Sequence, residues 1–345
     1  MKILWLAGDP PTHPLTGVRE RARYMLTYLA ARHEVYLLTF AGGEARQELQ
    51  TIPGLAHLTT LPFGQIGTMR QLIARIIAKW HPDVIHTQNF GLHPLVPPGE
   101  RQVLDPHDMP HPSVLATKGK YYFDAVERCA ATILVSEEER EKLPPPLRPK
   151  ALVLPNGVDV DYWAQAAAQP PEAATLLFPG AMNWEPNITA ALSFSEQAWP
   201  RICAAVPQAR LVFAGYNPAA EVLALSQTNA RIQVAANPAD MRPYFSQASV
   251  MIVPILKATG TRLKILQALA AGRPVVSTPV GAEGLQLTPG QDLLIAPPGE
   301  SFVQAVTGLL LDGEKRAALA RAGRQAVEQY RWERLLPLLE SLYPS

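Results

Sequence analysis

The residues best suited to chemistry lie in the segment GTRLKILQALAAGRPVVSTPVGAEGL, residues 260–285. It opens with a glycine turn and brings Arg262 and Lys264 into the first turn of an expected helix, whose apolar residues recur at helical spacing. A turn-to-helix junction offers backbone N–H groups and the positive end of the helix dipole. Two cations at such a junction suit a diphosphate, so the sequence predicts an anion site here.

Strands that alternate with helices are expected to position this segment. The first half predicts strands at residues 3–7, 34–39, 83–86, 102–104, 132–135 and 152–154, with helices at 18–32, 69–80, 121–131 and 137–143. The pattern then restarts, with strands at 175–178, 210–214, 232–234, 250–254, 275–276 and 293–295 and helices at 188–206, 221–229, 241–248, 262–271, 301–311, 314–329 and 332–342. This alternation predicts an α/β fold of two Rossmann-like halves, with ligands at the carboxyl ends of parallel strands.

Composition sets the class of protein. The chain has 345 residues, 48% apolar and 18% charged, which is enough for two domains with cores of their own. A net charge of +1 creates no field for nucleic acid. Cys129 and Cys203 lie far apart and are expected as reduced thiols. The start MKILWLAG predicts a strand rather than a signal peptide, and no apolar run approaches the roughly 20 residues that span a bilayer. We therefore expect a cytoplasmic protein without a transmembrane segment, and a peripheral membrane contact stays open.

The second informative segment is VLPNGVD, residues 153–159, whose Asn-Gly pair predicts a tight turn. With Tyr162 after it, this segment resembles the interdomain segment of the retaining glycosyltransferases of family 4, which have the GT-B fold, and residues 260–285 resemble their nucleotide-sugar site. The resemblance implies two Rossmann-like domains that face each other across a cleft. The implied parts are an acceptor-side domain at 1–157, a linker at 158–174, a nucleotide-sugar-binding domain at 175–328, and a C-terminal helix at 329–345 that packs back on the first domain.

The resemblance also implies an activity. A hexosyl unit would pass from a nucleoside diphosphate sugar, linked to UDP, GDP or dTDP, to an acceptor hydroxyl with retention of anomeric configuration. The implied catalytic residues are His107, Arg262 and Lys264, and the implied donor-binding residues are Gly17, Gly180, Thr259, Gly260, Thr261, Arg262, Lys264, Gln267 and Glu283. His86, which ends the segment PDVIH, is a further candidate for a sugar contact. The acceptor would be a carbohydrate, a lipid-linked molecule or a small metabolite. Neither a metal nor another cofactor is expected.

Two departures from the family pattern leave an alternative open. The family usually carries two glutamates eight positions apart, where this chain has Thr259 and Gln267. The loop FPGAMNWEPN, residues 178–187, lacks the usual Arg and Lys, so the cationic role falls to Arg262 and Lys264. The alternative is a non-catalytic nucleotide-sugar-binding or partner protein with a degenerate GT-B site. An oxidoreductase is disfavoured because no GxGxxG follows either opening strand, and a hydrolase because no Ser-His-Asp or metal signature is present.

Overall fold

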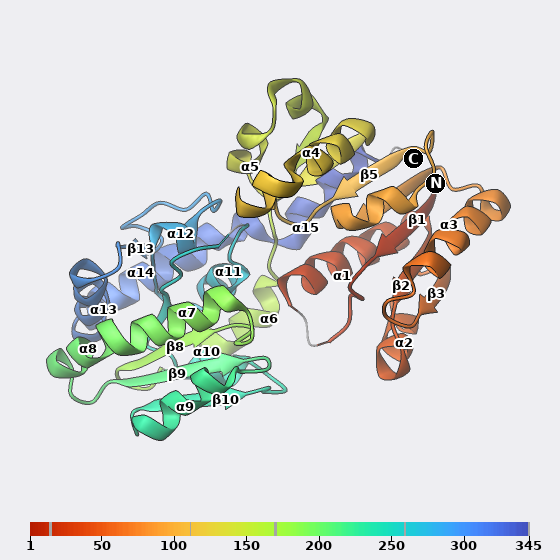
Figure 1. Cartoon of the computed structure of the whole chain (residues 1–345). Helices are drawn as coiled ribbons and strands as arrows, with labels where there is room; N and C mark the ends of the chain where they lie inside the picture. The colour runs from red at the N-terminus through yellow and green to blue at the C-terminus, as the bar shows by residue number, and fades with distance from the viewer. Residues whose placement is uncertain (14–15, 111, 169–170, 259, 344–345) are drawn as a thin grey trace. The chain divides into compact units, whose positions relative to one another are not determined.

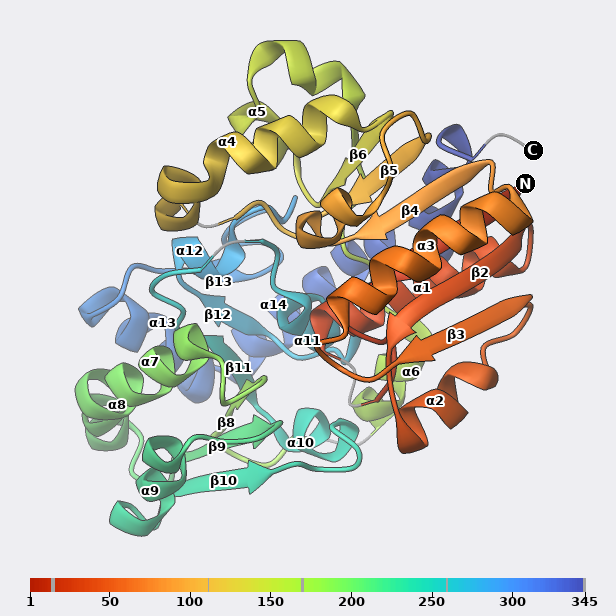
Figure 2. The same cartoon turned by 45° about the vertical axis from the view of Figure 1, so that its right-hand side comes forward.

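The computed structural model of the chain describes residues 1–13, 16–110, 112–168, 171–258 and 260–343. The chain divides into two compact units (Figure 1). Unit 1 consists of Met1–Asn156 together with Trp332–Ser345, and unit 2 consists of Gly157–Arg331. Each unit contains a parallel sheet with helices packed on it, and Figure 2 shows the strands of each sheet side by side.

Unit 1 has, within its described residues, a seven-stranded parallel sheet in the order β3-β2-β1-β4-β5-β6-β7. Its strands are β1 (Lys2–Ala7), β2 (Glu34–Phe40), β3 (His57–Leu61), β4 (Val84–Gln88), β5 (Gln102–Asp105), β6 (Ala131–Leu134) and β7 (Ala151–Val153). Its α-helices are α1 (Gly17–Ala30), α2 (Gly43–Gln50), α3 (Ile66–Trp80), α4 (Pro112–Arg128), α5 (Glu137–Lys142) and α15 (Trp332–Leu335), with short 3-10 helices at Phe90–Leu95, Pro145–Lys150 and Leu336–Ser341. The central strands are almost wholly buried, as expected for a sheet covered on both faces.

Unit 2 has, in the part of it that the structure describes, a six-stranded parallel sheet in the order β10-β9-β8-β11-β12-β13. Its strands are β8 (Thr175–Pro179), β9 (Arg210–Gly215), β10 (Ile232–Ala236), β11 (Val250–Val253), β12 (Val275–Ser277) and β13 (Leu294–Ile295). Its α-helices are α6 (Val160–Ala164), α7 (Glu185–Ser193), α8 (Trp199–Ala205), α9 (Ala220–Thr228), α10 (Arg242–Gln247), α11 (Leu263–Ala270), α12 (Pro279–Ala282), α13 (Glu300–Leu311) and α14 (Gly313–Ala326), with 3-10 helices at Gln165–Ala168 and Val327–Tyr330.

Both sheets have a switch point, at which the order of strands along the sheet reverses. In unit 1 it lies between β1 and β4, and in unit 2 between β8 and β11. In open parallel sheets, ligands bind outside the carboxyl ends of the strands at this point. The sequence prediction of two Rossmann-like α/β halves is therefore confirmed, and each half has one place where a ligand site is expected.

Some elements differ from the sequence prediction. The helix expected over 188–206 is interrupted by a π-helical turn, Phe194–Ala198, before α8. Pro200, near the start of α8, lacks an N–H, and its ring disfavours the regular turn before it. Helix α2 and strand β3 were not predicted at all. The sequence of β3, HLTTL, shows little alternation of apolar and polar residues. This fits its position in the fold, where its three middle residues are only half-buried.

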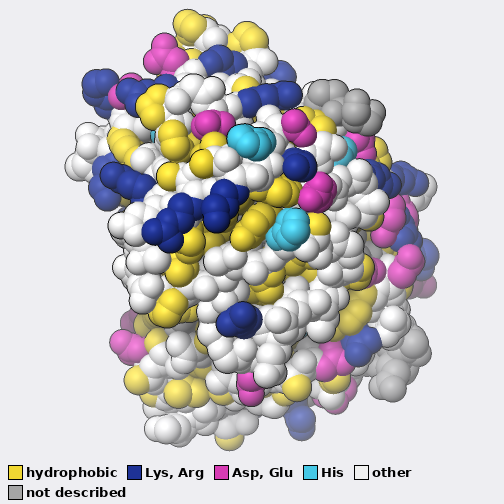
Figure 3. All heavy atoms as spheres, turned by 90° about the vertical axis from the view of Figure 1, so that its right-hand side faces the viewer, with side chains coloured by type: hydrophobic (Ala, Val, Ile, Leu, Met, Phe, Trp, Pro, Cys, Tyr) yellow, Lys and Arg dark blue, Asp and Glu magenta, His cyan; other side chains and the backbone are white. Residues whose placement is uncertain are grey.

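The face of the molecule drawn in Figure 3 carries both signs of charge. Figure 3 shows acidic and basic side chains interspersed over one face, with apolar side chains between them. This mixture agrees with the net charge of +1. Among the described residues, no helix is both long enough and apolar enough to cross a membrane.

Candidate functional site

The candidate site of unit 2 lies at its switch point, where the loop after β8 meets the start of α11. The loop begins at Gly180, which has a φ of +149°. A Cβ atom at this position would lie 2.8 Å from Asn187 Nδ2 and 2.9 Å from Lys264 Nζ. A side chain at this position would therefore displace the amide of Asn187 or the ammonium group of Lys264, and the φ of +149° itself favours glycine.

Asn187 and Lys264 form the centre of the cluster. Lys264 Nζ donates a hydrogen bond of 2.8 Å to Asn187 Oδ1, and Asn187 Nδ2 donates one of 2.8 Å to the carbonyl of Ala181. The ammonium nitrogen also lies 4.4 Å from the ring centroid of Phe178, the fourth residue of β8. The amide of Asn187 thus ties the β8 loop to the first turn of α11 and fixes the direction of the Lys264 side chain.

The electrostatics of Lys264 indicate a site prepared for an anion. Burial lowers the pKa of its ammonium group well below the usual 10.5, and repulsion from Arg262 lowers it further. Two cations held close together repel each other until an anion lies between or beside them. A bound diphosphate would supply that charge and raise the pKa of Lys264 again.

Arg262 occupies the N-cap position of α11, with an extended φ of −97°. Its side chain is only 6% exposed. Its guanidinium carbon lies 5.7 Å from the ring centroid of Trp184, a residue of the β8 loop that is itself 41% exposed. A guanidinium stacked on an indole keeps its planar donors directed to the side, which suits a bidentate contact with phosphate oxygens.

The loop after β8 contributes shape rather than backbone donors at two of its positions. The N–H of Gly180 donates to the carbonyl of Ala214, and the N–H of Met182 donates to the carbonyl of Tyr216. These two donors are engaged inside the protein. The contribution of Gly180 to the site is thus its missing side chain, which makes room for Asn187 and Lys264.

The remaining donor-binding candidates of unit 2 lie along the same edge of the sheet. Gly260 has a left-handed φ of +74°, and Thr261 is buried directly before Arg262. Gln267 is half-buried on α11, three residues after Lys264, so the two lie on neighbouring positions of one helix face. Glu283 is exposed at the C-terminal end of α12. Thr259 lies outside the described residues.

Two candidates belong to unit 1. Gly17 is the first residue of α1, close in sequence to Val18, whose carbonyl accepts a hydrogen bond from Gln88. His107 follows β5 with a φ of +73°, which is rare for a residue with a side chain. Its N–H donates to Asp105 Oδ1 at 3.1 Å, which holds this conformation. Strained backbone of this kind is often found at functional sites.

Asp105 is the anchor of the His107 turn. Its carboxylate is buried and accepts a 3.3 Å hydrogen bond from Arg21 Nε. Burial acts to raise the pKa of Asp105, but the nearby Arg21, His86 and His107 leave it below its ordinary value. Arg21 also donates to the carbonyl of Leu154 at 3.0 Å, so one buried ion pair ties α1 and the end of β7 to the turn that carries His107.

His86 is a core residue rather than a sugar contact. Its side chain has no exposed surface, and its ring stacks on Trp5 with 3.7 Å between the ring centroids. Its Nδ1 contacts the hydroxyl of Tyr343. Burial lowers the pKa of His86 to about 4, so the ring is neutral at physiological pH. The interpretation of His86 as a residue that meets a sugar is wrong for this reason.

Sequence reasoning missed Asn187 and Trp184 as members of the site. Both stand in the segment MNWEPN, none of whose side chains was predicted to contact the donor. The available signal was the turn-to-helix junction itself, since α7 begins at Glu185 and places Asn187 in its first turn. Among the described residues, no group of three or more His, Cys, Asp or Glu side chains could hold a metal ion.

Comparison with known proteins agrees with this architecture. Residues 173–312 match the family model "Glycosyl transferases group 1", and residues 15–162 match the model "Glycosyltransferase Family 4". These two matches fall on the two halves of the chain. The protein therefore belongs to the group 1, family 4 glycosyltransferases with the GT-B fold.

Individual relatives are distant. A phosphatidyl-myo-inositol mannosyltransferase of Mycolicibacterium smegmatis is 26% identical over 214 residues, which are 60% of this chain and 55% of that protein. The chain thus spans about half the length of this relative. A glycogen synthase of Mycobacterium tuberculosis is 24% identical over 97% of this chain and 83% of its own length. The crystal structure of Anabaena HepE in complex with UDP-glucose has a TM-score of 0.77 at 15% identity and covers the whole of both chains.

Proposed function

We propose that this chain transfers a hexosyl unit from a nucleoside diphosphate sugar to an acceptor hydroxyl, with retention of configuration at the anomeric carbon. The observation that carries the proposal is the cluster of Arg262 and Lys264 against Asn187 and Gly180 at the switch point of unit 2. Two cations at the start of one helix, with their positions fixed by neighbouring side chains, suit the diphosphate of the donor.

The chemical role of the cluster is the stabilisation of a leaving group. As the bond between the anomeric carbon and the diphosphate lengthens, negative charge grows on the diphosphate oxygens. Arg262 and Lys264 would neutralise that charge in a geometry set before the reaction begins. Gln267 would bind the ribose through its amide, and His107 would contact the donor sugar. Protein groups need not form a covalent bond to the sugar in this scheme.

The comparisons supply support of different kinds. Both family models describe glycosyltransferases. The solved HepE structure holds UDP-glucose, and one distant relative is a mannosyltransferase, so both glucosyl and mannosyl donors belong in a first screen. At 15% identity, the similarity to the HepE structure supports the fold alone.

The first test is a thermal-shift panel of the purified protein with UDP, GDP, dTDP and ADP, and with NAD as a control. A ligand that binds the native state raises the melting temperature by mass action. We expect one diphosphate to give a clear shift and the matching sugar nucleotide to be hydrolysed or transferred. Arg262→Ala should abolish the shift. Arg231→Ala should keep it, because Arg231 is an exposed arginine of the same unit whose guanidinium donates to the carbonyl of Pro207. No shift with any diphosphate in a folded sample would refute the proposal.

A second candidate function follows from Gln267. An amide in place of the family's carboxylate loses charge-assisted hydrogen bonds to the ribose, which favours a protein that binds a nucleotide sugar without turnover. A thermal shift by a diphosphate without glycosyl transfer to a broad acceptor panel would support this alternative.

Retention of configuration, which belongs to the transferase proposal, is tested separately. The anomeric proton coupling of the first product in NMR spectra measures it.

A further inference from the structure

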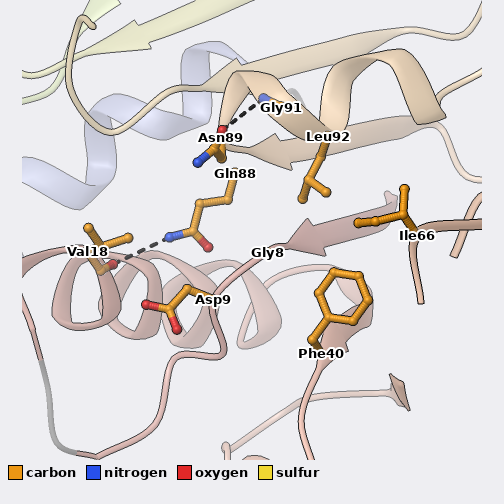
Figure 4. Close-up of a pocket in the computed structure, with 9 residues that line it drawn as sticks. All are labelled: Gly8, Asp9, Val18, Phe40, Ile66, Gln88, Asn89, Gly91 and Leu92. Atoms are coloured by element: carbon orange, nitrogen blue, oxygen red, sulfur yellow. Dashed lines mark hydrogen bonds between the residues drawn. The ribbon is translucent and has the colours of Figure 1, made fainter. Parts of the chain in front are cut away.

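Unit 1 contains a pocket of about 430 Å³ at its own switch point. The pocket lies at the carboxyl ends of β1, β2 and β4, and its walls are formed by Gly8, Asp9, Val18, Phe40, Ile66, Gln88, Asn89, Gly91 and Leu92 (Figure 4). Pockets for small ligands usually have volumes of about 300–1,000 Å³. The pocket is therefore large enough for a ligand of one or two rings.

The lining separates into a polar side and an apolar side. Figure 4 shows Asp9, Gln88 and Asn89 on one side and Phe40, Ile66 and Leu92 on the other. A ligand that fills the whole pocket must therefore have polar groups at one end and an apolar body at the other. A fully polar ligand would leave the aromatic wall against water or against hydroxyl groups.

The polar side has a buried acceptor directed into the pocket. Gln88 is only 3% exposed, and its Nε2 donates to the carbonyl of Val18 at 3.4 Å. Its Oε1 has no hydrogen-bond partner among the residues that the structure describes. A buried carbonyl oxygen that accepts no hydrogen bond is unfavourable. A ligand hydroxyl that donates to Gln88 Oε1 would therefore stabilise the bound state.

Asn89 adds a donor beside this acceptor. Its φ of +87° is unusual for a residue with a side chain, and its Oδ1 accepts the N–H of Gly91 at 2.8 Å. That bond assigns the remaining amide nitrogen as a donor. Asp9 supplies a carboxylate whose orientation is fixed by Arg19 at 2.8 Å. Two acceptors and one donor in this arrangement match neighbouring hydroxyl groups on one ring.

The apolar side continues from the pocket to the surface. The ring of Phe40 stacks with that of Phe63, with 6.0 Å between their centroids. Phe63 is 68% exposed and Ile66 is 46% exposed, so both offer apolar surface beyond the pocket. A ligand whose apolar part is longer than the pocket could extend along these two side chains.

We propose that this pocket binds the acceptor, and that the acceptor is an amphiphile with vicinal hydroxyl groups on an apolar body. Its hydroxyl groups bond to Gln88, Asn89 and Asp9, and its apolar part packs along Phe40, Leu92 and Ile66. This inference rests on the proposed glycosyl transfer, because it names the class of molecule that supplies the accepting hydroxyl.

The test measures binding by isothermal titration without any nucleotide, so it does not depend on the donor site. Three probes are compared: hexyl β-D-glucopyranoside, methyl β-D-glucopyranoside and hexan-1-ol. Hexyl glucoside is expected to bind at least about tenfold more tightly than either partial probe, because it alone fills both sides. Gln88→Met keeps the side-chain volume but removes the acceptor, and we expect it to weaken binding about tenfold.

Ile66→Asp provides a second variant at an exposed position that does not endanger folding. It should also weaken binding of hexyl glucoside about tenfold, while Leu311→Asp, at a 66% exposed position of unit 2, should leave it unchanged. Equal binding of methyl and hexyl glucoside, or hexyl glucoside binding that neither Gln88→Met nor Ile66→Asp weakens, would overturn the proposal.

Two further comparisons complete the test. The first distinguishes a lipid-borne from a soluble ligand, and the second distinguishes failure of the acceptor pocket from failure of the proposed glycosyl transfer. Phosphatidylcholine vesicles with and without a glucosyl diacylglycerol are sedimented with the protein. Sedimentation that requires the glycolipid and is lost in Ile66→Asp assigns a lipid-borne acceptor, and binding of free hexyl glucoside alone assigns a soluble one. Binding of hexyl glucoside combined with no thermal shift by any diphosphate would keep the pocket and refute the transferase. A thermal shift by a diphosphate without binding of hexyl glucoside would keep the transferase proposal and refute the acceptor pocket.

Discussion

Glu139 is a buried carboxylate whose protonation should be visible in the stability of the protein. It lies in the first turn of α5 and is almost fully buried. Its Oε1 accepts the N–H of Met109 at 2.9 Å, and its Oε2 accepts the N–H of Val135 at 3.3 Å. The side chain thus holds the chain just after His107 against the end of β6. Burial raises the pKa of Glu139 from 4.5 to about 7, and the nearby Asp108 adds to the rise.

The direction of the pH effect follows from this shift. A carboxyl group whose pKa is higher in the folded protein binds its proton more tightly there than in the unfolded chain. Its favourable contribution is fully present below pH 4.5 and is lost as the pH rises through about 7. Gln at this position does not titrate. We therefore expect the free energy of unfolding of Glu139→Gln, relative to wild type, to rise by about 2.5 kcal/mol between about pH 5 and pH 8.

Equilibrium unfolding in urea, followed by tryptophan fluorescence at several pH values, measures this difference. His86 titrates in the opposite sense over an overlapping range, because its pKa is lowered to about 4. It is present in both proteins, so its contribution cancels in the difference. Glu138→Gln is the matched control, since Glu138 is exposed on the same helix, and it should show no such dependence. Parallel stability curves for Glu139→Gln and wild type would refute the reasoning.

Three further predictions concern the site of unit 2. Gly180→Ala should reduce the thermal shift by a diphosphate, because the new Cβ would lie 2.9 Å from Lys264 Nζ and 2.8 Å from Asn187 Nδ2 and would displace them. Gly290→Ala, which has a φ of +81° and open space around it, should keep the shift, and an undiminished shift in Gly180→Ala would contradict the packing. Diphosphate binding should be accompanied by proton uptake at pH values below the usual lysine pKa of 10.5, because the lowered pKa of Lys264 rises again beside an anion; titration calorimetry over a range of pH, in buffers of different ionisation enthalpy, measures this uptake, and an undiminished uptake in Lys264→Met would rule out Lys264 as its source. Gln267→Glu should tighten nucleotide binding by up to about tenfold in a fluorescence titration, because a carboxylate forms stronger bonds to ribose hydroxyls; weaker binding would exclude Gln267 from the ribose contact.

The fold could be predicted from the sequence where apolar periodicity is strong. The buried strands β1, β2 and β8 and the helix α3 were located to within a few residues, because most of their core-facing positions are apolar. Strand β4 and helix α1 were located equally well from their apolar residues, although each also buries polar or charged side chains. Strand β3 and helix α2 could not be found in this way, since each has few buried residues. The place of β3 in the sheet is set by its parallel pairing with β2 rather than by its own pattern.

The site was only partly accessible from the sequence. Arg262 and Lys264 could be singled out because two cations at a turn-to-helix junction have a direct electrostatic meaning. Asn187 could not, because its role depends on a contact with Lys264 across 77 positions of sequence. The pocket of unit 1 was missed for the same reason, since β1, β2 and β4 bring together residues from Gly8 to Leu92.

The chain passes between the two units at Asn156–Gly157 and again at Arg331–Trp332. These two crossings lie side by side, because the N–H of Val158 donates to the carbonyl of Tyr330 at 2.8 Å and Val158 pairs with Arg331 in an isolated β-bridge. Unit 2 is therefore a continuous insertion whose ends nearly meet. Such an insertion can be excised as a single gene fragment and exchanged for that of another family member, with one short junction on each side. With the donor bound by unit 2 and the acceptor by unit 1, as proposed above, chimaeras made in this way would combine the donor preference of one protein with the acceptor preference of another.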